Sequence, residues 1–90
     1  MAEPIRVLLV DDQSLVRSGF HMLIDSEDDM AVVGEASNGA EALEKLRTIE
    51  VDVALMDIRM PVMDGVETTR RIAASSLPTR VMILTTFDLD

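Results

Sequence analysis

The 90-residue chain contains no cysteine, tryptophan or tyrosine, and its only aromatic residues are Phe20 and Phe87. Without cysteine there is no disulfide framework and no thiolate metal site. Because aromatic side chains are so few, the core must be built from aliphatic residues and methionine. The length suits one small domain with a thin core.

Positive charge is also scarce. Eight Lys and Arg residues stand against 17 Asp and Glu, which gives a formal charge of −9. This balance disfavours contact with nucleic acid or an anionic membrane surface, since both require clustered cations. No apolar run approaches the roughly 20 residues that cross a bilayer, and the Met-Ala-Glu-Pro start is unlike a signal peptide. We therefore expect a cytoplasmic protein.

Two apolar runs end on carboxylates. Residues 5–10 (IRVLLV) are followed by Asp11 and Asp12, and residues 51–56 (VDVALM) by Asp57. Such runs are typical of strands covered on both faces in a parallel sheet, whose ligands bind outside the carboxyl ends of the strands. If both strands point the same way, the three carboxylates converge. Two charges 4 Å apart repel by about 4 kcal/mol at an effective dielectric near 20, so the cluster favours an oxygen-seeking cation such as Mg²⁺.

The rest of the chain alternates helical and extended patterns in the order β-α-β-α-β-α-β, which favours a parallel sheet with right-handed crossovers. Asn38 and Glu41 have the spacing of a capping box at the start of the second helix. We expect Asp64 and Gly65 to begin the third helix, with glycine tolerating an unusual backbone angle. Helices are expected near residues 13–25, 39–49 and 66–73, and strands at 5–10, 30–34, 51–56 and 80–85.

Several apolar side chains are predicted to fill the core. Those at helical spacing in the first helix form one stripe, and methionines are adaptable core residues. His21 lies one position off the stripe and is expected at the surface. The stripe contains Val16, Phe20, Leu23 and Ile24, and the core methionines are Met22, Met30, Met56 and Met82.

Four short stretches together resemble the response-regulator receiver domains of two-component signalling. They are residues 10–13 (VDDQ), 56–61 (MDIRMP), 64–65 (DG) and 83–86 (ILTT). The resemblance covers essentially the whole chain. A further three stretches are similar to the subgroup that carries a LuxR-type helix-turn-helix output domain, namely 17–20 (RSGF), 34–39 (GEASNG) and 84–88 (LTTFD).

The resemblance implies a phosphotransfer site. Asp57 would accept a phosphoryl group from a phosphohistidine on a sensor histidine kinase, with Mg²⁺ as the cofactor. Asp12 would bind the ion directly and Asp11 through water, together with Asp57 and the backbone carbonyl of Arg59. Thr85 matches the switch hydroxyl that hydrogen-bonds the phosphoryl group.

The implied fold is α/β, a flavodoxin-like, doubly wound parallel sheet of the receiver type with strand order 2-1-3-4-5. Receiver domains also have a fourth helix, a fifth strand that ends on a lysine, and a fifth helix, and members of this subgroup have an output domain. These 90 residues contain no counterpart to any of these parts. We therefore expect residues 1–90 to be the N-terminal part of a truncated receiver domain. The fourth strand would then be an apolar edge, which pairs readily with another chain, so we expect self-association through it.

Two other functions are open at this point. A phosphatase of the haloacid-dehalogenase type also uses an aspartate nucleophile, but it needs a second Asp two residues later, where this chain has Arg59. A degenerate interaction module that never takes phosphate is favoured by the missing lysine and opposed by the three carboxylates. We expect a signalling module rather than an enzyme.

Overall fold

The computed structural model describes residues 3–84. Its elements alternate between strand and helix, so the predicted β-α-β-α-β-α-β order is confirmed. Two strands differ from the predicted bounds: the second continues to Ala36, and the third begins at Val53 instead of residue 51 and includes Asp57. The elements are β1 (Ile5–Val10), α1 (Ser14–Asp25), β2 (Met30–Ala36), α2 (Gly39–Leu46), β3 (Val53–Asp57), α3 (Gly65–Ala74) and β4 (Arg80–Leu84).

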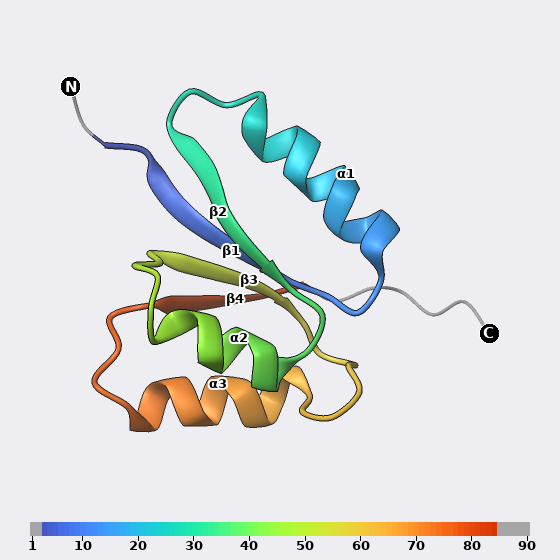
Figure 1. Ribbon diagram of the computed structural model, residues 1–90, viewed down its shortest axis with the longest axis vertical. Helices are drawn as coiled ribbons and strands as arrows, with labels where there is room; N and C mark the ends of the chain where they lie inside the picture. The colour runs from blue at the N-terminus through green and yellow to red at the C-terminus, as the bar shows by residue number, and fades with distance from the viewer. Residues whose placement is uncertain (1–2, 85–90) are drawn as a thin grey trace.

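The strands form one parallel sheet in the order β2-β1-β3-β4, as a doubly wound fold requires. α1 covers one face of this sheet, and α2 and α3 cover the other (Figure 1). The chain leaves β1 toward β2 and later returns to the other side of β1, where Val10 pairs with Met56. The carboxyl ends of β1 and β3 are therefore neighbours at the point where the winding changes direction.

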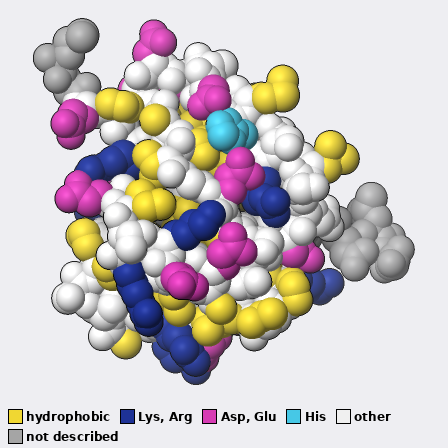
Figure 2. All heavy atoms as spheres, viewed as in Figure 1, with side chains coloured by type: hydrophobic (Ala, Val, Ile, Leu, Met, Phe, Trp, Pro, Cys, Tyr) yellow, Lys and Arg dark blue, Asp and Glu magenta, His cyan; other side chains and the backbone are white. Residues whose placement is uncertain are grey.

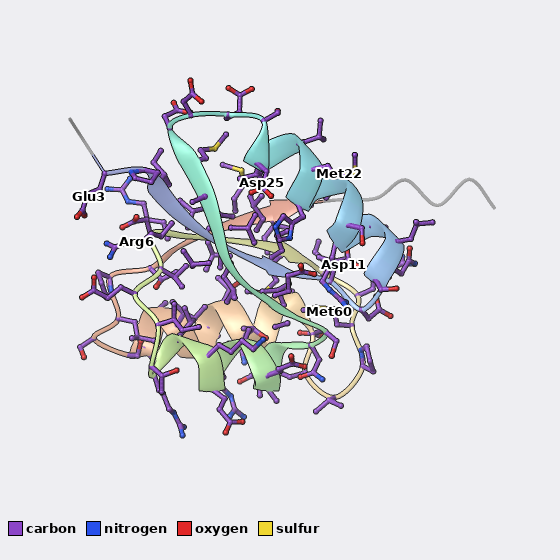
Figure 3. The ribbon with its side chains drawn as sticks, turned by 45° about the horizontal axis from the view of Figure 1, so that its top comes forward. Glu3, Arg6, Asp11, Met22, Asp25 and Met60 are labelled. Carbon is purple, nitrogen blue, oxygen red and sulfur yellow. The ribbon has the colours of Figure 1, made fainter. Side chains whose placement is uncertain are left out.

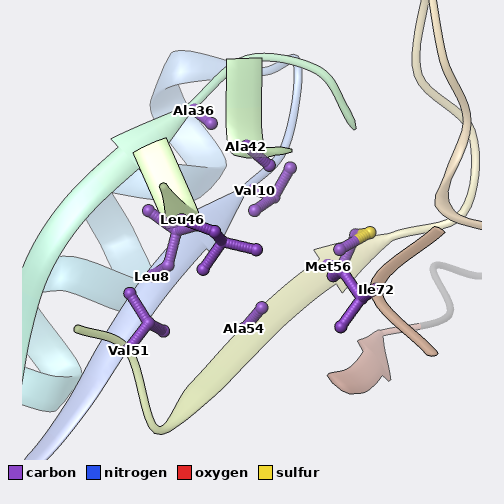
Figure 4. Packing of buried hydrophobic residues seen from close by; sticks show 9 residues of the cluster. All are labelled: Leu8, Val10, Ala36, Ala42, Leu46, Val51, Ala54, Met56 and Ile72. Carbon is purple, nitrogen blue, oxygen red and sulfur yellow. The ribbon is translucent and has the colours of Figure 1, made fainter. Parts of the chain in front are cut away.

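Alternate side chains of each strand serve two separate hydrophobic clusters. Leu8 and Val10 point toward α2 and α3, whereas Val7 and Leu9 pack with Ile24 on the face of α1. Figure 4 shows the larger cluster, in which Met56 lies beside Ile72 of α3. Its buried members are Leu8, Val10, Ala36, Ala42, Leu46, Val51, Ala54, Met56 and Ile72.

Some of the predicted core side chains are exposed. Leu23 is 65% exposed and Met22 is 75% exposed, and Met22 lies on the outer side of α1 in Figure 3. α1 packs mainly against β1 and β2, so only a narrow arc of the helix, which includes Phe20 and Ile24, meets the sheet. Met82 is 55% exposed because it lies on the α1 face of β4, beyond the reach of that helix.

The helix starts follow from local side-chain chemistry. Asn38 Oδ1 accepts a hydrogen bond of 2.9 Å from Glu41 N, as the predicted cap requires. The Glu41 carboxylate turns to the backbone N–H and hydroxyl of Ser37 instead of returning to Asn38. Asp64 Oδ1 accepts a bond of 2.9 Å from Glu67 N at the start of α3. Among residues 3–84, no helix combines the length and apolarity that a bilayer crossing requires.

Candidate acidic site at the carboxyl ends of the strands

The carboxylates of Asp11, Asp12 and Asp57 meet at one edge of the sheet. Asp11 and Asp12 directly follow β1, and Asp57 is the last residue of β3. One oxygen atom from each side chain lies within 4.8 Å of the others. Figure 3 shows Asp11 near the start of α1 and Arg6 at the opposite end of β1. The convergence that the two sequence runs predict is thus observed.

The two inner carboxylates are buried and held by backbone amides. Asp11 is 7% exposed and Asp57 is 9% exposed, whereas Asp12 is exposed to solvent. Gln13 N donates to Asp11 Oδ1 over 2.9 Å, and Ile58 N donates to Asp57 Oδ1 over 2.8 Å. One oxygen of each buried carboxylate is therefore fixed by its own loop.

The electrostatics of the cluster favour a bound cation. Burial raises the pKa of the Asp11 carboxyl, and the negative charges of Asp57 and Asp12 raise this pKa further. The Gln13 amide and the Arg17 guanidinium act in the opposite direction without cancelling the rise. Carboxylate oxygens are the ligands that Mg²⁺ and Ca²⁺ prefer. The donor set therefore fits a hard divalent ion, which would relieve the repulsion among the acids.

The loop after β3 is shaped by a close backbone approach. A Cβ atom at Gly65 would lie 2.4 Å from the carbonyl oxygen of Asp57, and Gly65 N donates to the carbonyl of Ile58. Positive φ occurs instead at Val62, with φ 70°. The prediction that glycine serves an unusual backbone angle here is therefore wrong: Gly65 is needed because any larger residue would collide with the end of β3.

Two further predicted site residues are placed less fully. Arg59 lies in the loop two residues after Asp57, with its side chain exposed, and its carbonyl stays a predicted ligand. Thr85 lies outside the described residues, and β4 as described ends at Leu84, which pairs with Asp57. The switch role of Thr85 accordingly stays a prediction.

A separate cavity of about 440 Å³ lies at the opposite, amino edge of the sheet, lined by residues that precede β3 and β4. Arg6 contributes to its wall and forms ion pairs with Asp52 and Glu50. The Arg6 guanidinium lowers the pKa of the Asp52 carboxyl. None of the three clustered acids lines this cavity, so it is not part of the acidic site.

Residues 7–90 match the family model of the response regulator receiver domain. The chain belongs to this family. The receiver chain is 45% identical over 83 residues to the transcriptional regulatory protein LnrK of Bacillus subtilis, covering 92% of this chain and 38% of LnrK. It spans about two fifths or less of the length of the curated relatives that it matches first.

Solved structures of receivers have the same fold. The signal receiver domain of the response regulator NarL from Mycobacterium tuberculosis is 40% identical, with a TM-score of 0.91 over 97% of this chain and 70% of that chain. A structure of the P1 domain of CheA3 in complex with CheY6 from R. sphaeroides matches at 37% identity and a TM-score of 0.82, covering 98% of this chain and 68% of that chain. The predicted receiver fold and its place in two-component signal transduction are thereby confirmed.

Proposed function

We propose that this receiver chain is the phospho-accepting module of a two-component response regulator, with Asp57 as the phosphoacceptor. The observation that carries the proposal is the meeting of Asp57 with Asp11 and Asp12 within 4.8 Å. The proposed donor is a phosphohistidine of a sensor histidine kinase. The likeness to a chain in the structure of the CheA3 P1–CheY6 complex supports this class of partner.

The proposed reaction is a nucleophilic displacement at phosphorus. A carboxylate oxygen of Asp57 attacks the phosphoryl group, the P–N bond to the donor imidazole breaks, and its electron pair returns to the ring nitrogen. An acyl phosphate forms on Asp57. Because Oδ1 already accepts the bond from Ile58 N, Oδ2 is the oxygen that we propose as the nucleophile.

The remaining site residues take supporting roles in this proposal. Asp11, Asp12, Asp57 and the carbonyl of Arg59 would hold Mg²⁺. When bound, the ion supplies positive charge that offsets both the carboxylates and the phosphoryl oxygens. The Thr85 hydroxyl would hydrogen-bond the phosphoryl group, so that phosphorylation of Asp57 alters the surface that a partner contacts.

The output of the whole protein is proposed to be transcriptional. LnrK is a transcriptional regulatory protein, and a separate DNA-binding part would carry that activity. We propose that the present segment itself acts as a cytoplasmic signalling module, not an enzyme, and contacts neither nucleic acid nor membrane. In support, Lys and Arg side chains are interleaved with Asp and Glu over the face shown in Figure 2, and the formal charge is −9.

Intact-mass spectrometry tests the phosphoacceptor directly. After treatment with acetyl phosphate and Mg²⁺, we expect the chain to gain the mass of one phosphoryl group, and Asp57→Asn to gain none. Asp52→Asn is the matched control, because it removes a carboxylate at the opposite edge of the sheet. An unmodified parent chain would support the interaction-module alternative, and rapid release of phosphate from added esters would support a phosphatase.

We further propose that the chain self-associates through β4. Within residues 3–84, β4 pairs with β3 alone and forms the edge of the sheet. Met82 is 55% exposed and Ile83 is 37% exposed on this strand, and an apolar unpaired edge is a template for another chain. We expect light scattering after size-exclusion chromatography to show a dimer or larger species, reduced by Met82→Lys but not by Met22→Lys on α1. A monomeric parent at tens of micromolar would disprove this proposal.

A further inference from the structure

One arginine connects the acidic site to two other elements of the fold. Arg17 on α1 has only 18% of its side chain exposed. Its Nη1 donates to the backbone carbonyl oxygen of Asp11 over 2.6 Å, and its Nε donates to Glu35 Oε1 on β2 over 2.9 Å. A single guanidinium therefore joins α1, β2 and the turn that carries the first two acids.

The carbonyl that Arg17 holds belongs to the peptide bond between Asp11 and Asp12. Because a peptide unit is planar, the direction of this carbonyl sets the direction in which Asp12 leaves the strand. The backbone N–H of Arg17 also donates to the carbonyl of Gln13 over 3.1 Å, and Gln13 N in turn holds the Asp11 carboxylate. The side chain of Arg17 and the first backbone hydrogen bond of α1 thus constrain the acidic turn from both sides.

Glu35 is itself held in place. Its Oε1 accepts the bond from Arg17, and its Oε2 lies 2.9 Å from Nδ1 of His21. These contacts lower the pKa of the Glu35 carboxyl, the His21 contact most of all. Arginine presents its N–H donors in a planar fork of fixed geometry, whereas the ammonium of lysine is a compact charge on a flexible stem and fixes the direction of its partners less strictly.

We infer that Arg17, oriented by Glu35, is a positioning residue for the acidic site: it fixes the peptide from which the Asp12 side chain would reach a bound Mg²⁺ ion. The inference rests on the proposed binding of Mg²⁺ by the acids. Charge by itself predicts the opposite effect, because a cation beside three carboxylates competes with a bound metal ion. The direction in which a substitution at Arg17 changes the affinity for Mg²⁺ therefore distinguishes a positioning role from a purely electrostatic one.

The test is the affinity for Mg²⁺ measured by isothermal titration calorimetry. Arg17→Lys keeps the charge and loses the fork, and we expect its affinity to fall by about 10-fold, the usual scale for residues that orient metal ligands. Arg17→Gln is expected to fall as well, although loss of a cation alone would raise the affinity. Arg71→Lys is the matched control, since Arg71 forms an exposed ion pair with Glu67, and its affinity is expected to equal that of the parent.

A double-mutant cycle tests whether Glu35 acts through Arg17. We expect Glu35→Gln to weaken Mg²⁺ binding when it is made in the parent chain. In a chain that already carries Arg17→Lys, we expect the same substitution to cause no further loss. Amide resonances of Asp12 and Gln13 are expected to shift in both single variants, and urea unfolding verifies that each variant folds. Unchanged affinity in folded Arg17→Lys and Glu35→Gln would overturn this inference alone. A parent chain that binds no Mg²⁺ would overturn the proposed function and this inference with it.

Discussion

Replacing Asp57 with Asn should stabilise the chain in the absence of metal. The carboxylate of Asp57 is buried beside Asp11, and one oxygen of each lies within 4.8 Å of the other. The raised pKa of Asp11 shows that ionisation of this group opposes folding, and that this loss of stability appears as the pH rises through the raised value. Asparagine removes one of the repelling charges and keeps an oxygen that accepts the bond from Ile58 N.

The size of the effect follows from the geometry. Two unit charges 4.8 Å apart repel by about 3.5 kcal/mol at an effective dielectric of 20. The pair with Asp12 adds about 1 kcal/mol or less, because Asp12 is exposed and screened by water. Side-chain adjustment lowers the total, so we expect Asp57→Asn to raise the free energy of unfolding by about 1–2 kcal/mol. For a domain of this size, each kcal/mol raises the melting temperature by about 4–8 °C.

Far-ultraviolet circular dichroism during urea or thermal unfolding is the suitable assay, because the chain has no tryptophan or tyrosine to report by fluorescence. The measurement is made at about pH 8 with EDTA, where carboxyls of ordinary pKa are ionised. Asp28→Asn on the exposed turn after α1 is the control, since it also removes one negative charge but does not touch the cluster. Added Mg²⁺ should stabilise the parent more than Asp57→Asn. A variant that is no more stable than the control would refute the reasoning.

Three other perturbations test the loop and the network around α1. Val62→Gly removes a β-branched residue from φ 70°. We expect the free energy of unfolding, measured in urea, to rise by about 0.5–1 kcal/mol after the larger entropy of the unfolded glycine chain is taken into account. A lower free energy of unfolding would contradict the presence of backbone strain at Val62. Gly65→Ala should cost about 2 kcal/mol or more and weaken Mg²⁺ binding, because its Cβ would lie 2.4 Å from the last carbonyl of β3; unchanged stability would contradict the close approach. His21 lies between Glu35 and Asp25, which raise the pKa of its imidazole, Glu35 most of all. The contribution of His21 to stability should be complete below about pH 6.5 and disappear as the pH rises through the raised pKa. The urea midpoint of the parent should therefore fall over this pH range relative to that of His21→Gln. Parallel plots of urea midpoint against pH for the two proteins would exclude the effect.

The acidic site could be predicted because its signals are local. An apolar run that stops at Asp57 and another that stops before Asp11 indicate two buried parallel strands. The side-by-side position of β1 and β3 then follows from the doubly wound order. Asn38 and Asp64 likewise mark their helix starts through bonds to residues three positions later. The strand ends and the helix starts depend on neighbours in the sequence, so the sequence by itself determined them.

The tertiary structure decided which faces are covered and what supports the site. Leu23 fits the helical stripe as well as Ile24 does, yet it is exposed because α1 meets only the β1–β2 side of the sheet. Gly65 is required because the backbone at the end of β3 lies too close to admit a Cβ atom, and no sequence pattern around Gly65 predicts that contact. Arg17 and Glu35 are 18 positions apart and meet only because α1 packs across β2. Hydrophobic periodicity and helix capping depend on residues close together in the sequence. Which side chains are covered, where a Cβ atom would collide and which distant residues form hydrogen bonds depend instead on which other element lies alongside.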